Sequence, residues 1–208
     1  MQHLLNTITI GDARELAQQI GDESIDLIYT DPPYPREFLH CFYELGEYAP
    51  RILKKGASLI TLCGQYQVPQ VLDAMKGLDF HWMGWLLSAQ KSTLFGYRIV
   101  CGGKPLLWFS KGRVNIDYGF YWDTKQSHGG ADKRFHEWGQ PEIYVRQDVE
   151  LLTRQGDTVL DPFCGGGQVA AVCKTLKRNF ITFEINPLTA KIARERVREA
   201  AHRRLFAV

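Results

Sequence analysis

The stretch that most constrains the fold is a short apolar run followed directly by two prolines. Residues 25–30, Ile-Asp-Leu-Ile-Tyr-Thr, are rich in strand-forming residues and lie between turn residues. Such a run is typical of a strand buried on both faces. Pro32 and Pro33 cannot donate hydrogen bonds to a central sheet, so the strand should stop at Asp31. We therefore expect this carboxylate at the carboxyl end of a strand, where open α/β sheets bind ligands.

The two prolines also affect what Asp31 can bind. An aspartate in a turn normally accepts a hydrogen bond from a backbone N–H one or two residues later, and proline has no such group. We therefore expect the carboxylate to be free for a ligand, with the aromatic face of Tyr34 beside it. The group formed by Asp31, Pro32, Pro33 and Tyr34 favours a planar ring that carries an exocyclic amine.

A second stretch predicts a nucleotide-binding unit. A strand is expected over residues 158–161, a glycine-rich loop over 165–167, a helix over 168–176, and a strand over 179–184 that ends in Glu184. This is the order of a βαβ unit in which an acid about 20 residues after the loop binds ribose hydroxyls. Glycines in the loop let backbone N–H groups approach a ligand closely.

The residues before the glycine loop bear on which nucleotide binds. Residues 165–170 also fit Gly-x-Gly-x-x-Ala, the pattern of dinucleotide-binding proteins. However, Asp161 and Pro162 directly precede the loop, where an ordinary Rossmann strand runs apolar into the first glycine. An acid at this position can bind an ammonium group, which S-adenosylmethionine has and NAD lacks. The predicted cofactor is therefore S-adenosylmethionine, with a dinucleotide oxidoreductase and a ligand-free turn as alternatives.

The rest of the chain alternates strands and helices, which predicts an α/β fold with a parallel sheet. Further strands are expected over residues 7–10, 57–63, 80–87 and 105–110, and a turn over 54–56. Further helices are expected over residues 14–20, from about 38 to Pro50, 67–76, 141–153 and 188–204, the last with an arginine-rich outer face.

Two segments, residues 88–104 and 111–135, interleave basic and aromatic residues and contain several glycines. Basic residues attract phosphates and aromatic rings stack on bases, which favours nucleic-acid contact. A solvated loop whose aromatic rings pack on the core is the other interpretation, and both stay open. The residues concerned are Lys91, Arg98, Lys104, Lys111, Arg113, Lys125, Lys133, Arg134, Phe95, Tyr97, Tyr118, Phe120, Tyr121 and Trp122.

Composition narrows the class of protein. The 208 residues, 45% hydrophobic and 23% charged, suit one domain, and a net charge of +2 is too small to indicate nucleic-acid binding by itself. The five cysteines lack metal-site spacing, so we expect no metal site. We expect their thiols to be free, as in a cytoplasmic protein. The first residues do not resemble a signal peptide, and no run approaches the roughly 20 apolar residues that span a bilayer.

The motifs together resemble those of a known family. Asp31-Pro32-Pro33-Tyr34 and Asp161-Pro162-Phe163-Cys164-Gly165-Gly166-Gly167 resemble the amino-group DNA methyltransferases of the permuted β class. Residues 9–13, 136–141 and 180–187 are similar to further motifs of that family. The resemblance implies a Rossmann-like S-adenosylmethionine-dependent methyltransferase fold, with a mostly parallel central sheet and helices on both faces. It implies a single domain, 1–208, with a catalytic half (1–87), a small target-recognition or loop region (88–135) and a cofactor-binding half (136–208).

The resemblance also implies roles for individual residues. Asp31, Pro32, Pro33 and Tyr34 would be catalytic. Asp12 and Ala13 would lie on the adenine side of the cofactor, although a Gly-Asp pair before a helix is often only a cap. The remaining cofactor-binding residues would be Asp161, Pro162, Phe163, Gly165 and Gly167 at the methionine end, Glu184 at the ribose, and Asn186, which should also cap the last helix.

The implied activity is methyl transfer to the N6 amine of adenine flipped out of double-stranded DNA. Asp-Pro-Pro-Tyr is commoner for adenine, whereas Ser in the first position is commoner for cytosine N4, so cytosine N4 remains an alternative. RNA or another amine is a further alternative, as is an inactive methylase-like module that binds nucleic acid. The oligomeric state, a homodimer included, and a restriction partner are left open.

Overall fold

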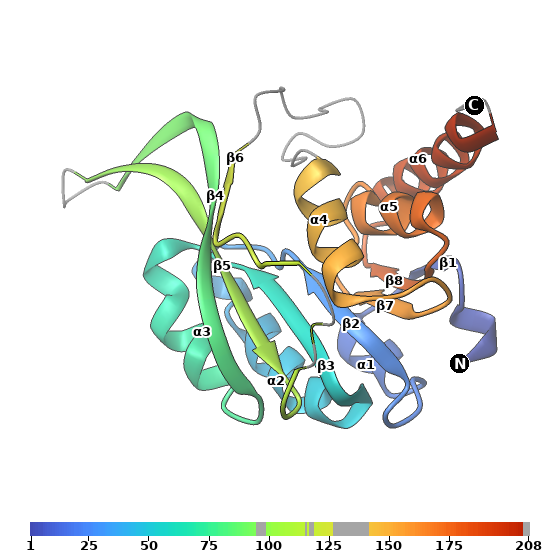
Figure 1. Ribbon diagram of the computed structural model, residues 1–208, viewed down its shortest axis with the longest axis horizontal. Coiled ribbons are helices and arrows are strands. Elements are labelled where there is room, and N and C mark those ends of the chain that lie inside the picture. The colour runs from blue at the N-terminus through green and yellow to red at the C-terminus, as the bar shows by residue number, and fades with distance from the viewer. Residues whose placement is uncertain (95–98, 115, 117–118, 127–141, 206–208) are drawn as a thin grey trace.

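The computed structural model describes residues 1–94, 99–114, 116, 119–126 and 142–205 and shows one central sheet (Figure 1). Its strands follow the order β1-β8-β7-β2-β3-β5-β4-β6. The strands are β1 (Thr7–Ile10), β2 (Ile25–Thr30), β3 (Leu53–Leu62), β4 (Asp79–Leu94), β5 (Ile99–Ser110), β6 (Thr124–Gln126), β7 (Thr158–Asp161) and β8 (Asn179–Glu184). Within the described sheet every pair is parallel except the two that contain β5. The carboxyl ends of the other strands therefore share one edge.

Helices cover both faces of the sheet. Figure 1 shows α1, α2 and α3 on one face and α4, α5 and α6 on the other. The helices are α1 (Ala13–Ala17), α2 (His40–Ile52), α3 (Val68–Ala74), α4 (Glu142–Leu152), α5 (Gln168–Leu176) and α6 (Pro187–Leu205), with single 3-10 turns at Gln2–Leu4, Arg36–Phe38 and Gln65–Gln67. A hydrophobic core lies on each face of the sheet, and β2 contributes side chains to both. Ile28 packs with the first set of helices, and Leu27 and Tyr29 pack with the second.

The chain leaves the middle of the sheet in two directions. From β2 it passes through α2 to β3 on one side, and from β7 it passes through α5 to β8 on the other side. Because α2 and α5 cover opposite faces, a crevice forms at the carboxyl edge between β2 and β7. Asp161 is the last residue of β7 and Asp31 directly follows β2, so the fold brings both carboxylates to this crevice.

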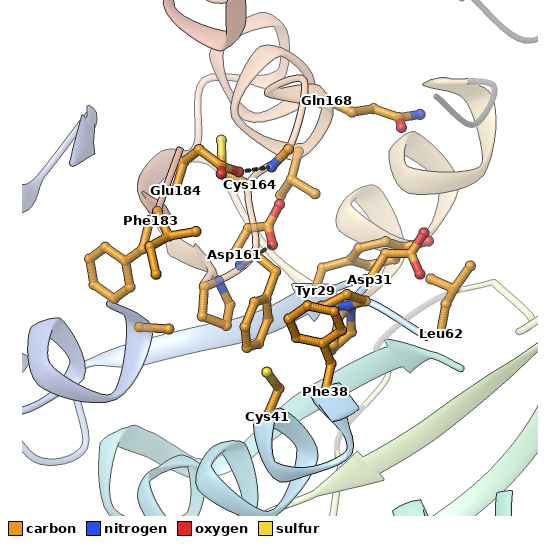
Figure 2. Close-up of a pocket in the computed structure, with 18 of the residues that line it drawn as sticks. Tyr29, Asp31, Phe38, Cys41, Leu62, Asp161, Cys164, Gln168, Phe183 and Glu184 are labelled. Atoms are coloured by element: carbon orange, nitrogen blue, oxygen red, sulfur yellow. Dashed lines mark hydrogen bonds between the residues drawn. The ribbon is translucent and has the colours of Figure 1, made fainter. Parts of the chain in front are cut away.

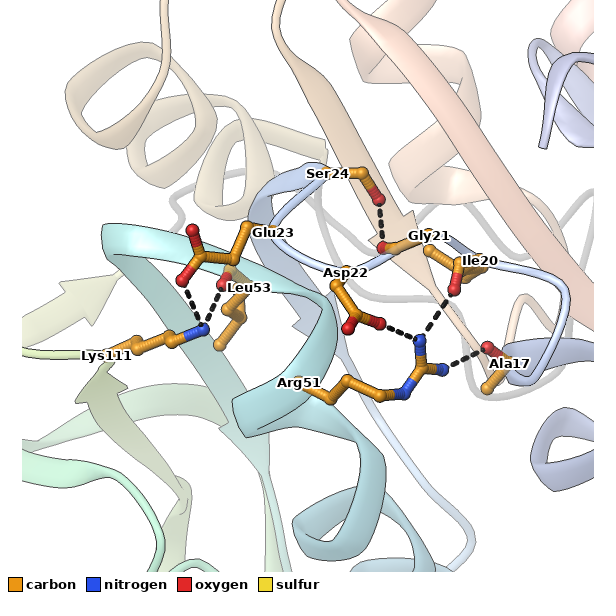
Figure 3. A network of polar contacts seen from close by, with 9 residues as sticks. All are labelled: Ala17, Ile20, Gly21, Asp22, Glu23, Ser24, Arg51, Leu53 and Lys111. Atoms are coloured by element: carbon orange, nitrogen blue, oxygen red, sulfur yellow. Dashed lines mark hydrogen bonds and ion pairs between the residues drawn. The ribbon is translucent and has the colours of Figure 1, made fainter.

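The opposite end of β2 is held by a polar network (Figure 3). Arg51 of α2 donates hydrogen bonds to the carbonyls of Ala17 (2.9 Å) and Ile20 (2.8 Å) and pairs with Asp22 (2.6 Å). Lys111 donates to the carboxylate of Glu23 and to the carbonyl of Leu53, both at 3.0 Å. These contacts fix the loop before β2, and with it the strand that carries Asp31.

The structure confirms the fold class predicted from the sequence. The strands over 7–10, 25–30, 158–161 and 179–184 and the helix over 168–176 have the predicted bounds. The turn expected over 54–56 is wrong, because these residues lie inside β3. Gly56 has a φ of +80° there and donates its N–H to the carbonyl of Lys111 at 2.7 Å, which makes an irregular strand rather than a turn. The first helix is also shorter than predicted and ends at Ala17.

Of the two interpretations left open for residues 88–104, the solvated loop is wrong for the backbone, because β4 continues to Leu94 and β5 begins at Ile99. Figure 1 shows the outer parts of both strands projecting beyond the rest of the sheet. Lys125 is not a solvated loop residue either, since it is 4% exposed and forms an ion pair with the buried Asp148 of α4. The motif over 136–141, residues 127–135, and Phe95, Tyr97, Arg98 and Tyr118 lie outside the described residues.

The arginine-rich outer face predicted for the last helix also needs a correction. Arg196 of α6 is 1% exposed and donates a hydrogen bond of 2.9 Å to Glu142 at the start of α4. The ion pair allows a buried guanidinium, which the helical pattern alone did not indicate.

Candidate active site

A cavity of about 760 Å³ lies at the carboxyl edge of β2 and β7. It is lined by all the predicted site residues except Gly167 and Asn186, namely Asp12, Ala13, Asp31, Pro32, Pro33, Tyr34, Asp161, Pro162, Phe163, Gly165 and Glu184. Figure 2 shows Asp31, Asp161 and Glu184 around this one space. Residues far apart in the sequence therefore form a single candidate site.

Asp161 is the buried carboxylate of the site, with an exposed fraction of 3%. Its Oδ1 atom accepts hydrogen bonds from the Thr30 hydroxyl (2.9 Å) and from the Phe163 N–H (3.2 Å). Burial raises the pKa of Asp161 to about 7, although both hydrogen bonds act in the opposite direction. The site thus holds a carboxylate whose ionised form is only partly stabilised by its protein neighbours, and a cation in the cavity would stabilise it further.

The glycine loop is held by Glu184 at the end of β8. Glu184 accepts hydrogen bonds from the N–H groups of Gly165 and Asn186, each at 2.9 Å (Figure 2 for the first). Gly165 has a φ of +48°, and a Cβ placed on it would meet nothing within 4 Å, so this part of the loop is open to a ligand. Glycine is suited to both the backbone angle and the close approach.

Gly167 has a different role from the one predicted. Its φ is +75°, and a Cβ placed on it would lie 2.8 Å from the Cβ of Ala193 in α6. Gly167 therefore allows the first turn of α5 to pack closely on α6, and the structure does not bring it to the cavity.

Two predicted cofactor residues are helix caps in the structure. Asp12 Oδ1 accepts hydrogen bonds from the N–H groups of Arg14 (2.9 Å) and Glu15 (3.2 Å), which caps α1, while the residue also lines the cavity. Asn186 Oδ1 accepts from Leu188 at 2.9 Å and so caps α6, outside the lining. Side-chain capping of this kind satisfies the unpaired N–H groups of a first turn.

Asp31 differs from the prediction, because its carboxylate is not free. The Tyr34 hydroxyl donates a hydrogen bond to Asp31 Oδ1, and the Lys104 ammonium lies 3.7 Å from Oδ2. The same ammonium lies 4.7 Å from the centre of the Tyr34 ring. Burial, together with the charge of Asp31, raises the pKa of Tyr34, so its hydroxyl keeps the proton that it donates. The prolines removed the local donors as expected, but side chains supply partners instead.

Lys104 and Thr30 are two residues whose place in the site the sequence did not reveal. Lys104 belongs to a segment for which phosphate contact and a solvated loop were both left open, yet it lies in β5, and its side chain reaches the cavity. Because β5 is antiparallel, its early residues lie at the edge where the parallel strands end. Strand direction was not readable from the sequence. Thr30 carried a weak signal, since a hydroxyl in a buried strand needs a hydrogen-bond partner.

The described cysteines fit the prediction of free thiols: Cys41, Cys63, Cys164 and Cys173 are all reduced and buried. Among the helices that the structure describes, none combines the length and apolar character that a bilayer crossing requires.

Comparison with solved structures defines the fold class. The chain resembles the M1.HpyAVI–S-adenosylmethionine complex (TM-score 0.74, 21% identity, 91% of this chain and 98% of that chain). It also resembles the PvuII DNA methyltransferase, which is cytosine-N4-specific (TM-score 0.77, 19% identity, 96% and 94%). The fold is that of the S-adenosylmethionine-dependent methyltransferases, as the sequence predicted.

Sequence comparisons then show which proteins the chain is similar to. A family model described as DNA methylase matches residues 115–195. The type II methyltransferase M.HinfI of Haemophilus influenzae is 28% identical over 94% of this chain and 69% of its own length. M.HpaI of Haemophilus parainfluenzae is 24% identical over 89% and 72%. These similarities support the N6/N4 family of amino-group DNA methylases, whose cofactor is S-adenosylmethionine.

Proposed function

We propose that this chain transfers the methyl group of S-adenosylmethionine to the N6 amine of an adenine flipped out of duplex DNA. The observation that carries the proposal is one cavity lined both by Asp31 to Tyr34 and by the glycine loop. Two reactants must be held in one space for a direct transfer, and correct placement can supply a large part of the rate. The similarity to DNA methylases supports the reaction class.

The residues around Asp161 fit the cofactor. The open side of Gly165 leaves room for a ligand against the loop, and the buried Asp161 carboxylate has a raised pKa. We assign Asp161 to the ammonium group of the methionine end and Glu184 to the ribose hydroxyls. Bound S-adenosylmethionine supplies an electrophilic methyl group on a sulfonium, so the protein has to position the acceptor rather than activate the donor.

The residues around Asp31 fit the acceptor. The lone pair of an aromatic exocyclic amine is delocalised into the ring, which makes the nitrogen a poor nucleophile. Asp31 Oδ2 and the Pro32 carbonyl would each accept one N–H of the amine and thereby draw the nitrogen toward tetrahedral geometry. Tyr34 would stack on the base and hold it out of the duplex. The N–CH3 bond forms as the S–CH3 bond breaks, which leaves S-adenosylhomocysteine, and the methylated nitrogen then releases its extra proton to water.

Exposed aromatic side chains support contact with DNA. Phe120 and Trp122, within the basic and aromatic segment predicted from the sequence, are 86% and 74% exposed. Aromatic rings at a protein surface offer stacking faces for bases, and Arg113 of the same segment is also exposed. We propose that this region takes part in binding the duplex, so affinity should fall as salt rises.

Cytosine N4 is the second candidate, because the PvuII enzyme with the same fold carries that specificity. The decisive experiment is to incubate the protein with mixed-sequence DNA and S-adenosylmethionine, digest the DNA to nucleosides and identify the methylated base by mass. N6-methyladenine supports the proposal, and N4-methylcytosine replaces it with the second candidate. No methylated base in any DNA, but retained DNA binding, would favour a methylase-like module without activity.

A further inference from the structure

Lys104 occupies the part of the cavity that the proposed function assigns to the target amine. Its ammonium lies 3.7 Å from Asp31 Oδ2 and 4.7 Å from the centre of the Tyr34 ring. These are the carboxylate and the aromatic face that the nucleobase would use. An ammonium and an exocyclic amine are both N–H donors, so both seek the same acceptor.

The arrangement of Asp31 shows which oxygen the two donors would share. The Tyr34 hydroxyl takes Oδ1 and thereby holds the carboxylate with Oδ2 facing Lys104. A base that donates to Oδ2 would meet the ammonium there. A base that stacks on the ring face covered by Lys104 would also meet it, so base and ammonium exclude one another at both contacts.

The contact between Lys104 and Asp31 is weak enough to be displaced. At 3.7 Å it is longer than a direct hydrogen bond, and the two side chains are 28% and 35% exposed. Ion pairs with this exposure contribute little to stability. The backbone of Lys104 is held in β5, where it pairs with Leu86 of β4, so only the flexible side chain has to move.

We propose that Lys104 holds the place of the target amine in the DNA-free enzyme and leaves it when a base enters. This inference rests on the proposed function. While in place, the ammonium compensates the charge of Asp31 in a partly buried site. When a flipped base enters, the ammonium has to leave Asp31 and Tyr34, so Lys104 adds a cost to base entry and acts as an internal competitor.

The test is the substitution Lys104→Met, which removes the charge and keeps an unbranched side chain of similar length. Without the competitor, kcat/KM for duplex DNA should rise about three- to tenfold, the range expected for one weak ion pair and one cation–π contact. The change should fall on KM for DNA, measured with labelled S-adenosylmethionine at saturation. Salt of about 0.2 M keeps distant phosphate attraction small, since the Debye length is then below about 8 Å.

Lys54→Met is the matched control. Lys54 pairs with Asp26 at 2.6 Å near the beginning of β2, at the end of the sheet away from the cavity. It makes the same change in net charge without touching Asp31, so kcat/KM should stay at the wild-type value. Lys104→Gln is a second neutral variant that should follow Lys104→Met, and Lys104→Arg keeps the charge and should show no gain.

The outcomes separate the two proposals. Methyl transfer by the wild type without a gain in the neutral Lys104 variants overturns the placeholder role alone. A fall in their kcat also overturns it, and would make Lys104 a group that binds the substrate. If the wild type transfers no methyl group to any DNA, the proposed function fails, and the inference that rests on it fails with it.

Discussion

Two aspartates, each followed by proline, end neighbouring parallel strands, but their surroundings differ. Asp161 is 3% exposed, and in the described part of the chain no cation pairs with it, so burial raises its pKa to about 7. The side chain of Asp31 is 35% exposed and has the Lys104 ammonium 3.7 Å away. The same local sequence therefore places a carboxylate at the cavity, while neighbours from other elements decide its electrostatic state.

The difference suits two kinds of ligand. A buried carboxylate without a counter-ion gains most from a cationic partner, which would restore its ionised form. A carboxylate that already has a cation nearby gains little from a second charge, but it can still accept a hydrogen bond from a neutral amine. We therefore assign the cationic methionine end to Asp161 and the neutral base to Asp31.

The largest effect is expected for Asp31→Asn. This change keeps the size of the side chain but replaces a carboxylate acceptor, so methyl transfer should fall by about 10²–10³-fold, as when one polar group is removed at a reacting centre. Affinity for S-adenosylmethionine should stay within about twofold, because Asp31 is not assigned to the cofactor. Transfer of tritium-labelled methyl groups to DNA measures the rate, and calorimetry measures the affinity for S-adenosylmethionine. Equal losses in both would contradict the division of roles between the aspartates.

The next effect is expected for Asp161→Asn. The amide oxygen can still accept the hydrogen bonds of Thr30 and Phe163, so the variant removes the charge and retains the fold contacts. S-adenosylmethionine should bind about 10- to 100-fold more weakly, the range for one charged hydrogen bond. Calorimetry on the free protein tests this, and unchanged affinity would place the ammonium elsewhere.

The pH dependence of Asp161 gives a second measurement on the same variant. Because its pKa in the free protein is about 7, protons compete with a cationic ligand below that pH. Wild-type affinity for S-adenosylmethionine should therefore weaken as pH falls from 7 to 5.5, and the dependence should flatten in Asp161→Asn.

The free energy of unfolding should change with pH in the opposite direction to the affinity for the cofactor. A pKa raised on folding contributes stability below the unfolded value of about 4, and this stability is lost as pH rises through 7. At pH 8 the Asp161→Asn variant should therefore be more stable than the wild type, with a free energy of unfolding higher by on the order of 1–3 kcal/mol. Urea unfolding at pH 8 measures this difference.

A smaller effect is expected at the glycine loop, where Gly165 and Gly167 form a matched pair. Gly165→Ala should weaken cofactor binding several-fold, because the methyl group enters the open side of the loop. The positive φ of this position adds about 1–2 kcal/mol of backbone strain. Gly167→Ala should mainly lower the free energy of unfolding, by about 1–3 kcal/mol beyond that strain, since its methyl group meets Ala193. Urea unfolding and calorimetry on both variants test the assignment, and the reverse pattern would exchange the two roles.

Much of the fold was predictable because its signals are local. Proline ends β2 by lacking an N–H, and glycine at positions 165–167 sets the turn between β7 and α5. These effects act over a few residues and need no knowledge of neighbours. The sequence misplaced three charged residues in particular, Lys104, Lys125 and Arg196, whose charges suggested exposure. Lys125 and Arg196 are buried against acids on other elements, and Lys104 lies at Asp31.

The sequence by itself determined that two carboxylates would end two buried parallel strands, one followed by a proline pair and one by a glycine loop. Only the tertiary structure decided that both face one cavity, that Thr30 donates to a residue 131 positions away, and that Lys104 lies against Asp31. The physical reason is range. Backbone restrictions act on the nearest residues, whereas the charge and hydrogen bonding of a side chain depend on whatever the folded sheet brings beside it.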